Sequence, residues 1–169
     1  MIQLSGFRDL YISELQEARS LETILAEALP KMARAASAEE LKRAFDDHTG
    51  ETREHLEVVE AMLRRLDAAD TQHVDQSIQS LAQESEKMAG MIEAGPLRDA
   101  ALIASAQRIE HYEMAVYGTL ATYARQLGLP EDEQLLAEIL EEERDTDDRL
   151  STIAEGLVNP AAVEEDAKA

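Results

Sequence analysis

Apolar side chains recur along the chain at intervals of three and four residues, a spacing that places them on one face of an α-helix. The first such segment covers residues 4–36, and its apolar face carries Phe7, Leu10, Ala18, Leu21, Leu25 and Ala28. Pro30 is expected to kink or break this helix, because proline lacks the backbone N–H that an interior helical position needs. The chain lacks the alternation of apolar and polar residues that is typical of half-buried strands. The pattern therefore predicts an all-α protein.

Helix boundaries along the rest of the chain follow from capping residues, glycines and prolines. Ser37 and Glu40 have the spacing of a capping box, which predicts the start of a second helix that exits through residues 68–72. The second long helix is expected over residues 37–67, and a shorter amphipathic helix follows it over residues 73–93. The third and fourth long helices are expected over residues 96–127 and 130–158. Pro160 is expected to close the last helix. The prediction is one domain over residues 1–158, with residues 159–169 as a frayed C-terminal tail.

The lengths of the helices and of their connections predict the topology. Helices of roughly 25–30 residues would each be about 40 Å long, which suits a bundle of nearly aligned helices. Short turns join the first helix to the second and the third to the fourth, whereas the link over residues 68–96 is long enough to cross the whole bundle. We therefore expect a ferritin-like four-helix bundle made of two helical hairpins with a long helical crossover.

The chain is strongly acidic and contains no cysteine. Of 169 residues, 36 are Asp or Glu and 16 are Lys or Arg, so the formal net charge is −20. This charge repels phosphate backbones and anionic lipids, so neither nucleic acid nor a membrane surface is an expected partner. The chain has no apolar run of membrane-helix length and no signal-peptide core, so the expected location is cytoplasmic. Without cysteine, thiolate zinc sites and iron–sulfur clusters are excluded, and a metal ion would need oxygen and imidazole ligands.

Charged residues interrupt the apolar face near the middle of every predicted long helix. These candidate metal ligands are Glu14 in the first helix, Glu51 and His55 in the second, Glu110 and Glu113 in the third, and Glu143 and Asp147 in the fourth. Burying an unpaired carboxylate costs several kcal/mol, so the cluster must be neutralised by protons, by Arg or Lys, or by cations. Because Arg53 and Arg108 lie off the apolar face, a pair of divalent metal ions is favoured.

The candidate ligands fall into two similar sets. The pairs Glu51 with His55 and Glu143 with Asp147 are spaced i, i+4, so each pair shares a helix face. In the predicted site Glu14 and Glu110 are terminal ligands, Glu51 and Glu143 are bridging ligands, His55 and Asp147 complete the ligand set of each metal ion, and Glu113 shifts on oxidation. Such symmetry is what a dinuclear carboxylate site in a helical bundle requires.

Other polar side chains near these faces have structural interpretations. His48 is expected to donate its ring N–H to an acid, and a role as a metal ligand is the less favoured alternative. Tyr11 and Tyr117 each lie one turn from a candidate ligand, where a phenol can hydrogen-bond a carboxylate, but a core tyrosine with a satisfied hydroxyl is the simpler interpretation. His73 and His111 are expected to be surface or packing residues.

Four stretches, residues 9–18, 28–45, 98–120 and 140–150, resemble the YciE/YciF group of bacterial ferritin-like stress proteins, and residues 98–120 are the most specific of them. The resemblance implies a rubrerythrin-like four-helix bundle with a di-iron centre, a homodimer and a link to the stress response. The usual ferritin-like pattern pairs Glu with His at i, i+3, whereas both pairs here are i, i+4 and Asp147 stands in place of a histidine. This departure favours an oxygen-rich site in which iron is expected and manganese is tolerated.

The main functional hypothesis is an oxidoreductase that acts on peroxide or O₂ at a dinuclear metal site, as a peroxidase or in a catalase-like or ferroxidase-like manner. A peroxidase would need an external electron donor, because the chain lacks rubredoxin-type cysteines. The alternative is a metal-free acidic helical-bundle dimer that acts as a stress-response interaction module. Changes from Glu to Gln on the apolar face would stabilise the metal-free module and destabilise the metal-loaded protein. Storage of iron in a cage is less favoured, because the sequence shows no cage-forming fifth helix.

Overall fold

The structure is a computed structural model that describes residues 4–68 and 73–168. Its helices are, in chain order, α1 (Phe7–Ala35), α2 (Glu39–Arg65), α3 (Gln76–Met91), α4 (Pro96–Gln126), α5 (Pro130–Ile153), a π-helical turn (Ala154–Val158) and α6 (Asn159–Asp166). Over these two ranges no residue lies in a strand, which confirms the predicted all-α class. No helix within the same ranges combines the length and the apolar character of a membrane span.

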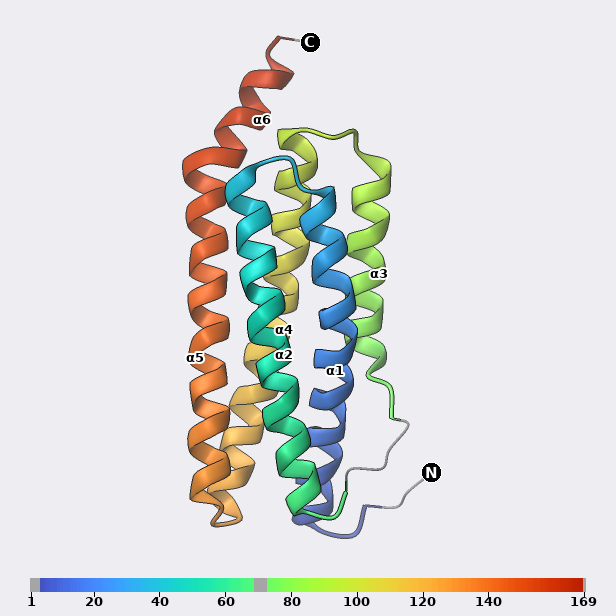
Figure 1. Cartoon of the computed structure of the whole chain (residues 1–169), viewed down its shortest axis with the longest axis vertical. Helices are drawn as coiled ribbons and strands as arrows, with labels where there is room; N and C mark the ends of the chain where they lie inside the picture. The colour runs from blue at the N-terminus through green and yellow to red at the C-terminus, as the bar shows by residue number, and fades with distance from the viewer. Residues whose placement is uncertain (1–3, 69–72, 169) are drawn as a thin grey trace.

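The long helices α1, α2, α4 and α5 run side by side along the length of the bundle (Figure 1). Short connections make antiparallel hairpins of α1 with α2 and of α4 with α5. The long link between the hairpins contains α3, which packs against α1 and α4 on the outside of the bundle. This arrangement confirms the predicted ferritin-like bundle of two hairpins with a helical crossover.

The apolar core is divided into two clusters, one toward each end of the bundle. The cluster at the end where α1 meets α2 contains Leu29, Phe45 and Leu102. The cluster at the opposite end contains Leu63 and Leu136. Full burial of one such side chain contributes roughly 1.5–3 kcal/mol to stability. The two clusters fix the helices above and below the middle of the bundle, where polar side chains are buried instead.

The start of α2 differs from the predicted capping box. Ala38 is the N-cap residue, and no side chain caps the helix at that position. Instead, the Asp99 carboxylate in α4 accepts hydrogen bonds from the backbone N–H groups of Ser37 and Ala38, both at 2.7 Å. The capping-box prediction is therefore wrong, because an acid from another helix satisfies these backbone donors.

The two prolines expected to interrupt helices also need correction. α1 continues without a break through Pro30, so the predicted break is wrong, whereas the alternative of a kink stays a prediction; Leu29 and Met32 beside Pro30 are buried in the core and hold the helix there. Pro160 does not close the last helix, because it lies in the first turn of α6, where a backbone N–H is not needed. The domain boundary at residue 158 and the fraying of residues 159–169 stay predictions. The predicted exit at residues 68–72 lies outside the described residues except for its first position.

Candidate metal centre

Six ionisable side chains are almost completely buried at the middle of the bundle. None of them is more than 3% exposed, and they come from all four long helices: Glu22 in α1, His48 and His55 in α2, Glu110 and Glu113 in α4, and Glu143 in α5. Charged side chains are rarely buried to this extent unless they are paired or bind a metal ion.

The first subset, here called the four-residue group, consists of His48, Glu110, Glu113 and Glu143. One ligand atom from each of these residues lies within 4.8 Å of the others. His48 Nε2 is 3.3 Å from Glu110 Oε1, 3.8 Å from Glu143 Oε2 and 3.9 Å from Glu113 Oε2. One imidazole nitrogen thus faces three carboxylates.

The second subset, the three-residue group, consists of Glu22, His55 and Glu143. His55 Nδ1 lies 3.0 Å from Glu143 Oε1 and 3.9 Å from Glu22 Oε1. The Tyr117 hydroxyl donates a hydrogen bond to Glu22 Oε1. Because Glu143 belongs to both groups, its two oxygens can bridge two metal ions, one in each group.

Each histidine also contacts a half-exposed acid through the ring nitrogen that faces away from the cluster. His48 Nδ1 is 3.3 Å from Glu51 Oε2, and His55 Nε2 is 2.6 Å from Glu142 Oε2. Carboxylates in such positions fix the orientation and the tautomer of a metal-binding imidazole. The inner nitrogen of each ring is then available as a ligand.

Many of the inward-facing atoms have no hydrogen-bond partner among the described residues. These atoms are Glu22 Oε2, His48 Nε2, His55 Nδ1, Glu110 Oε2 and both carboxylate oxygens of Glu113 and of Glu143. Each unsatisfied buried polar group costs about 1–3 kcal/mol, and a charged group costs more. Divalent cations bound by these atoms would remove that cost. Carboxylate oxygens with two imidazoles are a donor set that suits iron or manganese.

Burial raises the pKa of three carboxyl groups in the cluster. The pKa of Glu22 and that of Glu110 rise to about 8 from an ordinary value of 4.5. The pKa of Glu113 also rises, because burial is reinforced by the charge of Glu143. These carboxyl groups therefore retain protons near neutral pH when no cation is bound.

The pKa of both cluster histidines also lies above its ordinary value. Burial acts to lower the pKa of His55, but the carboxylates of Glu143, Glu22 and Glu142 together outweigh burial and raise it to about 9. The pKa of His48 rises in the same way, against burial and mainly because of Glu110. Without a cation, acids and imidazoles thus share protons in the interior, and a divalent cation would displace those protons.

The structure brings four of the seven predicted ligands together: His55, Glu110, Glu113 and Glu143. It does not bring Glu14 into the cluster. Glu14 is half-buried two turns before Glu22 on α1, and its pKa is raised by burial and by the nearby acids Glu17 and Asp75. Glu22 occupies the position in α1 that was expected for Glu14.

Glu51 and Asp147 also lie outside the two groups of ligand atoms. The Glu51 side chain is 44% exposed and contacts the cluster only through His48. Asp147 accepts a hydrogen bond of 3.2 Å from Gln107 and lies 3.4 Å from His111 Nε2. These positions do not support the predicted ligand roles of Glu51 and Asp147. The helices α2 and α5 are rotated about their axes so that His48, His55 and Glu143 face the interior instead.

Two residues of the cluster were missed or misjudged from the sequence. Glu22 was not among the predicted ligands, although Leu15, Ala18, Glu22 and Leu25 form a buried face with three- and four-residue spacing. For His48, support of an acid was favoured over the alternative of a ligand role. Its Nδ1 does face Glu51, but its Nε2 points into the four-residue group.

The two core tyrosines have different partners. Tyr117 is fully buried and donates to Glu22, so it contacts the cluster directly and the simpler interpretation was incomplete. Tyr11 donates a 3.0 Å hydrogen bond to Asp132, away from the cluster, as expected for a core tyrosine with a satisfied hydroxyl. His111, whose side chain is 69% exposed, is a surface residue as predicted.

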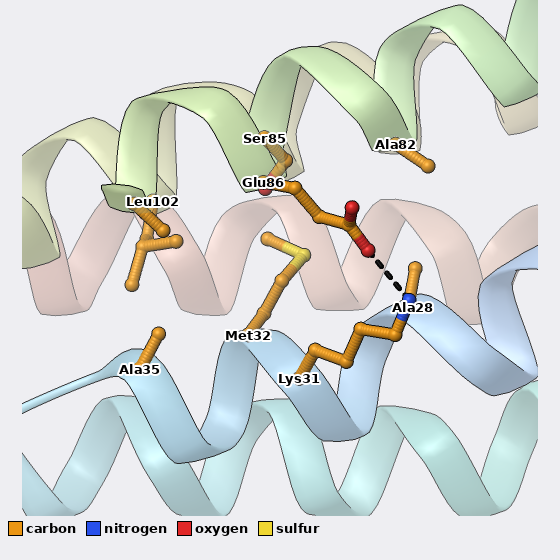
Figure 2. A pocket seen from close by; sticks show the side chains of 9 residues that line it. Ala28, Lys31, Met32, Ala35, Ala82, Ser85, Glu86 and Leu102 are labelled. Atoms are coloured by element: carbon orange, nitrogen blue, oxygen red, sulfur yellow. Dashed lines mark hydrogen bonds and ion pairs between the residues drawn. The ribbon is translucent and has the colours of Figure 1, made fainter. Parts of the chain in front are cut away.

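A separate cavity of about 130 Å³ lies between α1, α3 and α4 (Figure 2). Its lining is mostly apolar, with Met32 and Leu102 among the larger side chains. Lys31 and Glu86 form a 2.5 Å ion pair across it, as Figure 2 shows. None of the six cluster residues lines this cavity, so we place the candidate chemistry in the polar cluster.

The family described as a domain of unknown function, DUF892, matches residues 6–163. Protein YciF of Escherichia coli (strain K12) is 38% identical over 162 residues, which cover 95% of this chain and 98% of that protein. The crystal structure of the E. coli stress protein YciF matches with a TM-score of 0.87 and 39% identity, over 92% of this chain and 99% of that chain.

Two further solved structures are similar. YcfI from Rhodopseudomonas palustris has a TM-score of 0.85 and 31% identity, over 90% of this chain and 97% of that chain. A protein from Xanthomonas campestris pv. campestris has a TM-score of 0.76 over 95% of this chain and 99% of that chain, and its 23% identity indicates a shared fold. These similarities cover the helices that carry the polar cluster.

Proposed function

Because this chain belongs to the DUF892 family and is similar to the E. coli stress protein YciF along nearly its whole length, we propose that it is a stress-associated ferritin-like protein with a dinuclear metal site that acts on peroxide or O₂. The observation that carries this proposal is the shared Glu143 carboxylate. Both of its oxygens are buried without a hydrogen-bond partner, and each faces a histidine from α2.

The proposed ligands differ in part from those expected from the sequence. Glu143 is the carboxylate that would be shared by the two ions. His48, Glu110 and Glu113 of the four-residue group would hold one ion, and Glu22 and His55 of the three-residue group would hold the other. Iron is the expected metal, and manganese is the alternative because the same oxygen-rich donor set accepts both.

A bound pair of iron or manganese ions would supply redox chemistry that exchanges two electrons with peroxide or O₂. Reduction of one hydrogen peroxide molecule to two water molecules consumes two electrons and two protons. The electrons come from an external donor in a peroxidase, from a second peroxide molecule in a catalase-like reaction, or from ferrous ions in a ferroxidase. The apolar clusters on either side of the site exclude water, and Tyr117 holds the Glu22 carboxyl in place.

A metal-free interaction module remains the second candidate, because the raised pKa values show how the cluster can neutralise itself with protons. The two candidates differ in their response to Glu113→Gln. In a metal-free module the neutral amide removes a buried acid and raises the free energy of unfolding. In a metal protein the same change lowers the stability of the loaded form, because bound metal stabilises the native state. Urea unfolding with and without added metal distinguishes them.

The direct experiment is to purify the protein with iron or with manganese and to measure bound metal after dialysis. We expect two ions per chain in the wild type, and consumption of hydrogen peroxide that is lost in Glu143→Ala. The matched control is Glu141→Ala, which removes a 66% exposed carboxylate from the same helix. A wild-type protein that retains no metal would contradict the proposal.

Assembly and location are further proposals. The resemblance implies a homodimer, which light scattering coupled to gel filtration tests through the molar mass in solution. The cytoplasmic location expected from the sequence stays a prediction, which cell fractionation tests. An external electron donor is proposed only if peroxide consumption requires an added reductant.

A further inference from the structure

The bundle is covered unevenly around its middle. α3 packs on α1 and α4, and within the described residues no further helix packs on α2 and α5 (Figure 1). The α2–α5 side of the bundle carries His48, His55 and Glu143, the cluster residues that these two helices contribute. On this side α3 does not separate the cluster from solvent.

Two acids on this side of the bundle connect solvent to the cluster. The Glu51 side chain is 44% exposed and lies 3.3 Å from His48, whose side chain is only 2% exposed. The Glu142 side chain is 55% exposed and lies 2.6 Å from His55, whose side chain is only 3% exposed. Each acid thus contacts solvent and, through one imidazole ring, the buried ligand atoms.

The opposite side of each ring points to atoms that lack partners. His48 Nε2 and His55 Nδ1 are buried and face carboxylate oxygens at 3.3 Å and 3.0 Å, but neither contact has the geometry of a good hydrogen bond. The hydroxyl of Thr52, which lies on α2 between the two histidines and is fully buried, likewise has no described partner. Each of the two exposed acids therefore contacts a histidine whose inner ring nitrogen belongs to the buried cluster.

We propose that Glu51 and Glu142 are the residues that capture divalent cations from solution and pass them to the cluster on its α2–α5 side. This inference rests on the proposed function, because it requires a metal ion as the ligand. A carboxylate has more acceptor positions than one hydrogen bond uses, so each acid can bind a cation while it still contacts its histidine. The net charge of −20 attracts cations to the surface in general, and these two acids direct them to one place.

The basic side chains at this face do not cancel the two acids. Arg149 of α5 is paired with Asp47 of α2 at 2.9 Å, and Arg144 is paired with Glu141 at 3.0 Å. The charge of Arg149 also acts on Glu51, but more weakly than that of His48, which Glu51 contacts directly. Glu51 and Glu142 are the acids on this side whose contacts are with the cluster histidines.

The test measures the rate of metal uptake separately from the amount bound. Purified metal-free protein is mixed with Co²⁺ in a stopped-flow instrument, and the visible absorption of bound cobalt reports loading. The double variant E51Q/E142Q keeps an oxygen that can accept from each histidine but removes both charges. The matched control E54Q/E141Q removes two charges from exposed residues on the same two helices.

We expect E51Q/E142Q to load about tenfold more slowly than wild type at low ionic strength, with two Co²⁺ per chain at equilibrium, and E54Q/E141Q to load at nearly the wild-type rate. The difference should shrink in 1 M salt, where the Debye length is about 3 Å. Equal rates for the two double variants would overturn the inference and leave the proposed function intact. Loss of bound cobalt in E51Q/E142Q would also overturn it, because the acids would then be ligands. A wild type that binds no Co²⁺ would overturn both.

Discussion

The four-residue group places three carboxylates around the ring of His48, whereas the three-residue group places two around the ring of His55. In the three-residue group Tyr117 already donates a hydrogen bond to Glu22. In the four-residue group both oxygens of Glu113 lack a partner among the described residues. The four-residue group therefore has more carboxyl groups and more unsatisfied atoms, and it should bind the first metal ion.

The difference between the groups shows how one symmetric bundle can hold two unequal sites. Glu143 is the only residue common to both groups, so an ion in one group withdraws charge from the other. The two ions should therefore bind in sequence rather than together. Each prediction below changes one group, or the charge that both groups share.

The largest effect is expected for Glu143→Gln, which removes the shared carboxylate. Both groups lose a charged ligand, so we expect binding of both ions to weaken more than about 100-fold. Elemental analysis after dialysis should find almost no metal in this variant. The control Glu141→Gln should retain two ions per chain. Retention of either ion at wild-type affinity by Glu143→Gln would show that the groups do not depend on a common bridge.

The pH dependence of stability should have opposite signs in the metal-free and metal-loaded proteins. In the folded metal-free protein Glu22 and Glu110 have a pKa of about 8 and His55 of about 9, all above their ordinary values of 4.5 and 6.5. The folded state then holds more protons than the unfolded state, so stability falls as pH rises from about 5 to 9, by several kcal/mol in all.

Metal binding requires the ligands to lose those protons, so the stabilisation by metal grows over the same pH range. Urea unfolding at a series of pH values, with a chelator and with Mn²⁺, measures both profiles. A metal-free profile that is flat between pH 5 and 9 would contradict the assignment of shared protons to the cluster.

Separate variants should divide the two groups. Glu22→Gln affects only the three-residue group, so we expect it to lose the weaker ion and to keep the tighter one. Glu113→Gln affects only the four-residue group, so the tighter ion should bind roughly 10 to 100 times more weakly. Titration with Mn²⁺, followed by electron paramagnetic resonance, resolves the two steps. Identical curves for the two variants would mean that the groups are equivalent.

The smallest effect is expected for Tyr117→Phe. Loss of the hydrogen bond to Glu22 should cost about 1 kcal/mol and weaken only the second ion, by about fivefold. The control is Tyr11→Phe, which removes another buried tyrosine hydroxyl, one bonded to Asp132 rather than to the cluster. Calorimetric titration with Mn²⁺ measures both variants, and an equal loss of affinity in the control would point to a general loss of packing.

The ligands of the second hairpin could be predicted from the sequence better than those of the first. Glu113 and Glu143 lie equally far from Gly128 at the α4–α5 turn, so an antiparallel hairpin brings them to the same height. Counted in residues from the α1–α2 turn, Glu14 is much farther away than His48 or His55. The count to Glu22 falls between the counts to the two histidines. A count from the turn would have favoured Glu22.

The rotation of each helix about its axis is what the sequence left open. In α2 the buried face is centred on His48, Thr52 and His55, so Glu51 falls at its edge. One residue step turns a helix by about 100°, and several choices of face fit an acidic helix almost equally well. Only packing against the other helices selects one rotation, which is why the presence of a buried cluster was predictable and part of its membership was not.

The most direct measurement is anomalous diffraction from crystals of the protein grown with iron or manganese. The account predicts two anomalous peaks in each chain, one beside His48 and one beside His55, with the Glu143 carboxylate between them and the stronger peak in the four-residue group. Crystals in which the cluster shows no anomalous peak at saturating metal, with Glu143 bonded only to protein groups, would contradict it.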